Sequence, residues 1–140
     1  MFERSHDALE SLHQRGLLNR GQIDVVAIQK QMDAYVSLSE RSSGTSTTRS
    51  FLAEYDALMR LVEVILICSE FRIGPQPHRV LKDVINAMTP DSRIHDICDA
   101  RHKAKKFSVE PPAELRSRLS SIRRQVESVV KREIELLLDD

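Results

Sequence analysis

An arginine and a histidine stand side by side at Arg101 and His102, at the start of a basic segment. Arginine carries a permanent positive charge that binds phosphate, and histidine exchanges a proton near neutral pH. Metal-independent cleavage of a phosphodiester needs an acid or base that works near neutral pH and a cation for the phosphate, and histidine and arginine supply these. Arg101 and His102 are therefore the candidate catalytic residues. The alternative is that the histidine is a solvated polar residue on a helix surface, and the sequence does not decide whether this chain is an enzyme.

Positive charge continues along the chain after this pair. Lys103, Lys105 and Lys106 follow directly, and residues 101–132 hold ten Lys or Arg against three Glu, although the formal net charge of the whole chain is zero. A local excess of positive charge can bind an anionic partner. Arg101, Lys103, Lys105 and Lys106 are therefore the candidate anion-binding residues. Solvated helix faces produce such runs as well.

Other kinds of site have weaker support in the sequence. His95, Asp99 and His102 follow one another at helical steps of four and three, which could place three metal ligands on one helix face. A solvated face is the simpler interpretation, so we expect neither a metal nor a cofactor. The sequence contains no Gly-rich phosphate loop, paired-cysteine motif or nucleophile elbow. Cys68 and Cys98 stand among apolar neighbours, which favours buried free thiols over a disulfide framework.

The elements that carry these residues are predicted to be helices. The chain has 140 residues, of which 41% are hydrophobic and 30% are charged, and only four Gly and five Pro interrupt it. This length and composition are typical of one globular domain. We expect an all-α fold of five or six helices without a sheet, in a single domain over residues 1–140.

The N-terminal part, 1–40, is expected to hold two helices. Ser5 can cap a short helix that ends at Gly16, because glycine commonly follows the last turn of a helix. Asn19 has capping-box spacing and is expected to begin the second helix. The stretch 41–48 has no apolar side chain and is rich in turn-forming residues, so it is expected to be a loop.

The core part, 49–140, is expected to begin with a long central helix over 49–71, because this stretch is strongly apolar and contains no Gly or Pro. Two shorter helices follow, the first beginning in the proline-rich segment and the second capped by Thr89. The last helix should begin near Pro112 and run for roughly 25 residues. The expected core residues are Tyr55, Met59, Val62, Leu66, Val84, Ile97, Ile122 and Val126.

The central helix and the corner after it carry a family resemblance. Residues 51–59 alternate Ala, Tyr and Ala at short helical spacing, Arg72 follows at the corner, and His78 stands at the start of the next helix. This order resembles the alanine-tyrosine-alanine rhythm, the glycine-tyrosine-arginine corner and the following histidine of the HEPN superfamily. Members of that superfamily are helical bundles. Glu70 departs from the pattern, because it stands where the family has its corner glycine.

The second segment, Ile97–Phe107, is similar to the arginine-asparagine stretch of the same family. Active HEPN ribonucleases carry an arginine, a polar residue and then a histidine four to six positions further along. Arg101 matches the beginning of that motif, but positions 106–108 hold Lys, Phe and Ser, so the motif is incomplete. Arg72 and His78 satisfy the bare spacing, although they span a proline-rich corner between early helices.

The resemblance implies a HEPN-like core over 49–140, with long central and C-terminal helices, that pairs as a homodimer. The last helix favours the same pairing, because its apolar seam is longer than the rest of a compact domain can cover. We expect a module that binds RNA, a nucleotide or a partner protein such as an antitoxin or a nucleotidyltransferase. One alternative is a metal-independent endoribonuclease of a toxin or defence system. Another is a purely structural adaptor whose N-terminal helices, over residues 5–40, bind a second protein.

The sequence also bears on where the protein works. No apolar run approaches the about 18 residues that a membrane-spanning helix needs. The charged N-terminal residues are unlike those of a signal peptide. We therefore expect a cytoplasmic protein without membrane contact.

Overall fold

Six α-helices and one two-stranded antiparallel sheet make up the fold in the computed structural model, which describes residues 2–42 and 47–139, with side chains from Asp7 onward. Their order is α1 (Phe2–Gln14), β1 (Leu18–Arg20), α2 (Val25–Ser42), α3 (Thr47–Cys68), β2 (Phe71–Ile73), α4 (Pro77–Met88), α5 (Ile94–Phe107) and α6 (Ala113–Leu138). The predicted helical class and the number of helices are confirmed. The expectation of no sheet is wrong.

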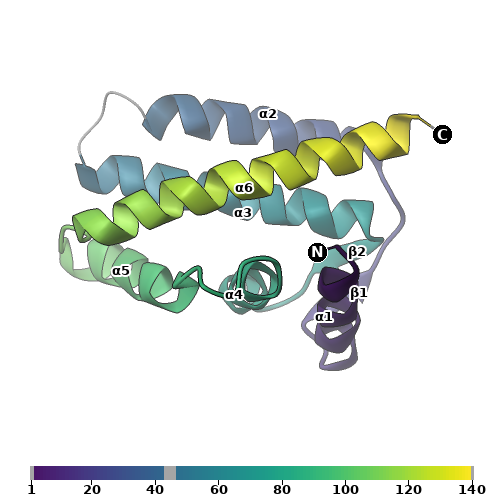
Figure 1. Ribbon diagram of the computed structural model, residues 1–140, viewed down its shortest axis with the longest axis horizontal. Coiled ribbons are helices and arrows are strands. Elements are labelled where there is room, and N and C mark those ends of the chain that lie inside the picture. The colour runs from purple at the N-terminus through teal and green to yellow at the C-terminus, as the bar shows by residue number, and fades with distance from the viewer. Residues whose placement is uncertain (1, 43–46, 140) are drawn as a thin grey trace.

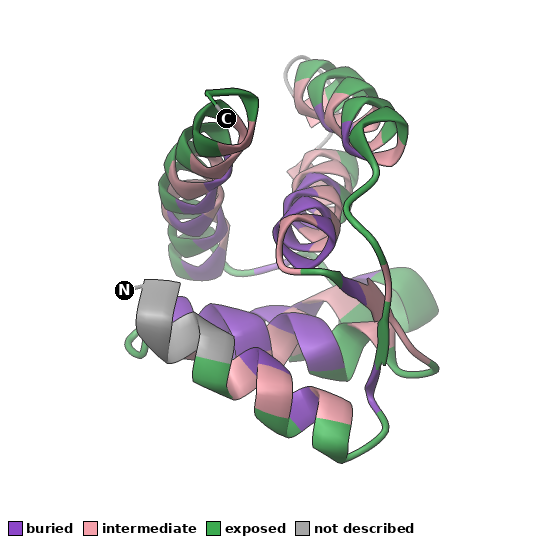
Figure 2. Ribbon diagram, turned by 90° about the vertical axis from the view of Figure 1, so that its right-hand side faces the viewer, coloured by how far each residue is buried: buried purple, intermediate pink, exposed green. Residues whose placement is uncertain are grey.

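Helix α3 is the centre of the fold. Figure 1 shows α2, α3 and α6 lying lengthwise together, with α4 seen end-on below them. Helices α2 and α6 lie on either side of α3, whose ribbon is coloured mainly as buried or intermediate (Figure 2). Ten of the 22 residues of α3 are buried, as expected for a helix that is apolar on most sides. Even so, no helix in the described part of the chain is long and apolar enough to cross a membrane.

The small sheet ties the N-terminal part of the chain to the end of α3. Leu18 pairs with Ile73 and Arg20 pairs with Phe71, across about fifty positions of sequence. Glu70 adopts a left-handed backbone with φ 66°, which turns the chain out of α3 and into β2. The predicted central helix therefore ends three residues too late, because Phe71 lies in a strand.

The N-terminal helices begin at positions other than those predicted. Helix α1 begins at Phe2, before the predicted cap Ser5. It ends as predicted at Gly16, which has a left-handed backbone with φ +78° just after the last turn. Asn19 lies in β1 and does not cap α2. The cap is Asp24, whose Oδ1 accepts a hydrogen bond from the Ala27 N–H at 3.1 Å.

Helix ends in the second half of the chain agree better with the sequence. Helix α4 begins at Pro77, and α6 covers 26 residues from Ala113, both as predicted. Helix α5 begins at Ile94, several residues after the predicted cap, because a left-handed Arg93 intervenes. Part of the predicted loop 41–48 is helical, since α2 ends at Ser42 and α3 begins at Thr47. Residues 43–46 of that loop lie outside the described residues.

The buried apolar side chains form one contiguous cluster that draws on every helix. Seven of the eight expected core residues belong to it, namely Tyr55, Val62, Leu66, Val84, Ile97, Ile122 and Val126. Met59 is only partly buried and packs against the edge of the cluster. The two cysteines are free thiols and are half-buried.

Candidate functional site

Arg101 lies on the face of α5 that packs against α3. Its guanidinium carbon is 4.7 Å from the centroid of the Tyr55 ring. No carboxylate of the described residues forms an ion pair with Arg101, and its Nε is buried without a hydrogen-bond partner. The stacking contact supplies only weak compensation for a positive charge in this position. Arg101 is therefore a fixed cation without a counterion in the described part of the chain.

The Tyr55 hydroxyl joins three helices beside this arginine. It lies 2.9 Å from Nδ1 of His78, at the start of α4, and 3.4 Å from Sγ of Cys98 on α5. Tyr55 itself is 1% exposed, so its ring belongs to the core while its hydroxyl reaches the polar group. We call Tyr55, His78, Cys98 and Arg101 the histidine–arginine site.

The surroundings of His78 favour its neutral form. Contact with the protein removes part of the ring from water, and this desolvation is the main reason why the pKa of His78 is lowered. The positive charges of Arg101, Lys105 and Lys82 lower the pKa further, and only the Asp56 carboxylate opposes them. Because the usual pKa of histidine is about 6.5, His78 is mostly neutral at neutral pH.

Burial raises the pKa values of the Tyr55 hydroxyl and the Cys98 thiol, whereas it lowers the pKa of His78. It raises the pKa of Tyr55 far above its ordinary value, and the neighbouring Cys98 adds to this rise. It also raises the pKa of the Cys98 thiol. Both groups therefore keep their protons at neutral pH.

A chain of hydrogen bonds can consequently run through the site in either direction. If the Tyr55 hydroxyl donates to His78 Nδ1, then Nε2 carries the ring proton and is a donor. If His78 Nδ1 donates to Tyr55, then Nε2 has a free lone pair and can accept a proton. Nε2 has no hydrogen-bond partner among the described residues, so it is available to a ligand in both cases.

Further polar residues continue the site along the seam between α4 and α5. His78, Lys82 and Asn86 recur every fourth residue and thus share one face of α4. At the far end, Asn86 Nδ2 donates to His95 Nε2 at 3.0 Å. Lys82 and Lys105 form no ion pair with any described carboxylate. Arg101, Lys82 and Lys105 outnumber the Asp56 and Asp99 carboxylates that act on His78 and Cys98, so the seam carries a net positive charge.

The predicted site residues are divided between different faces of α5. Arg101 and Lys105 act on His78, whereas His102 packs edge-on against the exposed Phe107 at 6.4 Å between ring centroids. Lys106 also lies near that ring, with Nζ 6.0 Å from its centroid. Lys103 lines a separate pocket with Arg93 and Asp96. The predicted pair of Arg101 and His102 thus points to two environments, and only Arg101 belongs to the histidine–arginine site.

The sequence did not identify His78 as the partner of Arg101. The signal available was the polar spacing of His78 and Lys82 on one helix face, together with Cys98, Arg101 and Lys105 on another, but nothing in the sequence joins the two faces. Arg72, which has ribonuclease-like spacing to His78, donates instead to backbone oxygens of Phe71 and Gln22. It holds the corner near the sheet.

A metal centre finds no support in the described part of the chain. Among those residues, no three His, Cys, Asp or Glu side chains are grouped as ligands for a metal ion. Of the three residues with suitable spacing, His95 is engaged with Asn86 and His102 with Phe107. His95, Asp99 and His102 are therefore exposed residues of α5 that happen to have the spacing of metal ligands.

Both segments with a HEPN resemblance contribute to the histidine–arginine site. Tyr55 and His78 come from the first segment, and Cys98 and Arg101 come from the second. Comparisons with models of protein families, with curated proteins and with solved structures found no match for this chain. Membership of the HEPN superfamily therefore rests on the resemblance of these segments and is a proposal.

Proposed function

We propose that this chain is a HEPN-like helical module that binds RNA and holds a backbone phosphate at the histidine–arginine site. The observation that carries this proposal is the unpaired Arg101, whose Nε is buried without a hydrogen bond. An arginine in this state lacks a negatively charged hydrogen-bond acceptor. The oxygens of a phosphate are such acceptors, and their geometry matches that of the guanidinium. His78 Nε2 lies on the same site and offers a second contact.

The length of the positive seam favours a polymer over a single anion. From His78 to Asn86 the chain advances eight residues along α4, which corresponds to about 12 Å. Lys82 and Lys105 add two more unpaired cations to Arg101 along this seam. A strand of RNA presents successive phosphates at a spacing that several such cations can contact together.

Binding of phosphate should also change the protonation of His78. The neighbouring cations disfavour the charged imidazolium in the free protein. A bound phosphate reverses that effect, because it brings negative charge next to the ring. RNA binding should therefore be accompanied by proton uptake, and affinity should rise as the pH falls through the pKa of His78 in the complex, until the ring is protonated in the free protein as well.

The test is binding of a fluorescent single-stranded RNA, measured by anisotropy over a series of salt concentrations. For single strands the slope of log affinity against log salt is about −0.7 per neutralised phosphate, so Arg101→Met should weaken binding and reduce the slope by about 0.7. Lys103→Met is the matched control, because Lys103 lies on another face of α5. Absence of binding at low salt, or equal effects of the two variants, would overturn the proposal.

A second candidate function is metal-independent cleavage of RNA. The lowered pKa of His78 favours it, since a neutral imidazole can take the proton of a ribose 2′-hydroxyl while Arg101 holds the phosphate that is attacked. Water would then protonate the departing 5′-oxygen. Purified protein with RNA and a chelator should yield cleavage that His78→Gln abolishes and His102→Gln preserves. Intact RNA at high protein concentration would leave binding as the function.

We also propose that the module is a homodimer. Figure 1 shows that the start of α2 and the end of α6 lie at the same end of the molecule. Large apolar side chains are exposed there: Val25 is 62% exposed, Val26 78%, Leu136 55% and Leu138 70%. Pairing of two copies about a two-fold axis at this end would cover these side chains. If the protein is a monomer, the exposed Val25 and Val26 fit the alternative of an adaptor whose N-terminal helices bind a different protein.

A further inference from the structure

A separate pocket of about 320 Å³ opens between the first turns of α3 and the first turns of α6. It shares no residue with the histidine–arginine site. Helix α3 contributes Thr47, Ser50, Phe51 and Glu54, and α6 contributes Arg116, Ser117, Leu119 and Ser120. The volume is at the small end of the range for ligand sites in proteins.

Two charged side chains in this pocket have polar atoms without partners. Nε of Arg116 is buried without a hydrogen bond, and Arg116 forms no ion pair with a described carboxylate. Oε1 of Glu54 is also buried without a hydrogen bond. Buried polar groups are almost always satisfied in folded proteins, so each of these atoms calls for a partner. One needs an acceptor and the other needs a donor.

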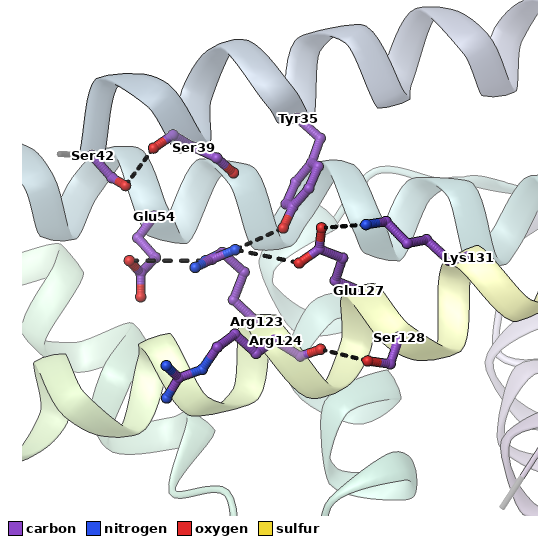
Figure 3. A network of polar contacts seen from close by, with 9 residues as sticks. All are labelled: Tyr35, Ser39, Ser42, Glu54, Arg123, Arg124, Glu127, Ser128 and Lys131. Atoms are coloured by element: carbon purple, nitrogen blue, oxygen red, sulfur yellow. Dashed lines mark hydrogen bonds and ion pairs between the residues drawn. The ribbon is translucent and has the colours of Figure 1, made fainter.

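Figure 3 shows a single contact of Glu54, to Arg123. The other oxygen of Glu54, Oε2, is 3.9 Å from Nε of Arg123, which is a long ion pair. Arg123 is held elsewhere, because its Nη1 donates to the Tyr35 hydroxyl at 2.7 Å and lies 3.7 Å from Glu127. Glu54 therefore keeps one buried oxygen for a donor that the described residues do not provide.

The remaining walls of the pocket are apolar or carry hydroxyl groups. Phe51 and Leu119 are 3% and 1% exposed and form its apolar floor. The Ser50 hydroxyl is already used, since it donates to the Ser42 carbonyl. Ser117 and Ser120 on α6 remain available for hydrogen bonds to an oxyanion next to Arg116.

We infer that this pocket binds a small zwitterion, specifically an α-amino acid with an apolar side chain. The carboxylate would accept hydrogen bonds from Arg116, and the ammonium would donate to Oε1 of Glu54. The side chain would lie on Phe51 and Leu119. A simple anion fits less well because the Glu54 carboxylate repels it, and a simple cation fits less well because Arg116 repels it. A ligand with both charges satisfies both orphan atoms at once.

The test compares L-leucine with two analogues that each lack one charged group. 4-Methylpentanoate keeps the carboxylate and side chain without the ammonium, and 3-methylbutylamine keeps the ammonium and side chain without the carboxylate. Binding is measured by calorimetry and by the NMR signal of the Arg116 Nε–H group. L-Leucine should bind and shift that signal, and each analogue should bind at least about tenfold more weakly, the loss of one charge-assisted contact. No binding of L-leucine at millimolar concentration, or equal binding of either analogue, would overturn the inference.

Variants locate the binding to the pocket. Arg116→Met removes the guanidinium while it keeps the length of the stem, and it should weaken L-leucine at least about tenfold. Arg118→Met is the matched control, since Arg118 is exposed two positions along the same helix and should change nothing. Arg101→Met should also leave L-leucine binding unchanged, so this inference and the proposed RNA site fail independently. Unchanged binding in a folded Arg116→Met protein would contradict the inference, and the Nε–H signal of the wild-type protein tests it even if that variant does not fold.

Discussion

The hydrogen bond between Tyr35 and Arg123 should stabilise the packing of α2 and α6 on α3. Nη1 of Arg123 donates to the Tyr35 hydroxyl at 2.7 Å, and Tyr35 is 3% exposed. A hydrogen bond to a charged group contributes about 1.5–3 kcal/mol to stability. Because the Arg123 side chain is still 19% exposed and lies 3.7 Å from Glu127, water and that carboxylate compensate in part. We therefore expect Tyr35→Phe to reduce the free energy of unfolding by about 1.5–2 kcal/mol.

Removal of the arginine should cost more than removal of the hydroxyl. Arg123→Met also leaves the Glu54 carboxylate, whose side chain is 12% exposed, without its nearest cation. A loss of about 2–4 kcal/mol is expected, which overlaps the lower part of the range of about 3–5 kcal/mol for breaking a fully buried ion pair. Arg124→Met is the matched control, because Arg124 is exposed on the next position of α6 and its side chain points away from the network in Figure 3.

A double-mutant cycle isolates the contact itself. Urea unfolding of the wild type, Tyr35→Phe, Arg123→Met and the double variant, followed by circular dichroism, should give a coupling energy of about 1–2 kcal/mol. The slope of unfolding free energy against urea should stay constant, so that the midpoints report stability alone. A coupling below about 0.5 kcal/mol, or an equal loss in Arg124→Met, would show that the bond between α2 and α6 contributes little.

Three further predictions concern the core, the corner after α3 and the assembly. Leu66→Ala should cost about 2–5 kcal/mol in a urea unfolding experiment, because Leu66 is 1% exposed, and a loss below about 1 kcal/mol would contradict its place in the core. Glu70→Gly should raise the free energy of unfolding by about 0.5–1 kcal/mol, since φ at Glu70 is 66° and a left-handed backbone disfavours residues with a Cβ. The control Ser69→Gly should give no gain, because φ at Ser69 is not positive, and destabilisation by Glu70→Gly would refute the reasoning. Sedimentation at micromolar concentration should detect a species of twice the 16.0 kDa chain mass, which Leu136→Glu and Leu138→Glu together should convert to monomer, whereas a wild-type monomer would refute the proposed homodimer.

Much of the helical framework follows from local patterns that the sequence displays. Apolar residues at steps of three and four identify α3, α4 and α6, and the proline and glycine signals at Pro77 and Gly16 mark ends that the structure confirms. The sheet could not be predicted in this way. Strands of three residues are too short for a periodic signal, and β1 meets β2 only because the chain folds back across about fifty positions. The late start of α5 likewise depends on the left-handed turn at Arg93.

The candidate site was predictable only in part, for a related reason. Arg101 stands out by residue type, and the sequence places it on a helix. Tyr55 was expected in the core, which is correct for its ring, but its hydroxyl also contacts His78 and Cys98. These residues lie on three helices, so their proximity depends on how α3, α4 and α5 pack. The sequence instead favoured His102 as the partner of Arg101, because the two residues are adjacent in the chain.

The pKa of His78 with and without RNA is the most direct test of the proposed phosphate site. The five histidine rings can be followed by NMR over a pH titration, and His78→Gln identifies the signal of interest. Without RNA, the pKa of His78 should lie below the usual value of about 6.5, and Arg101→Met should raise it because one of the neighbouring cations is removed. Addition of single-stranded RNA should raise the pKa of His78 in the wild type and in Lys103→Met, and at the same RNA concentration the rise should be largely lost in Arg101→Met. RNA that binds the wild-type protein while the pKa of His78 stays unchanged would contradict the account.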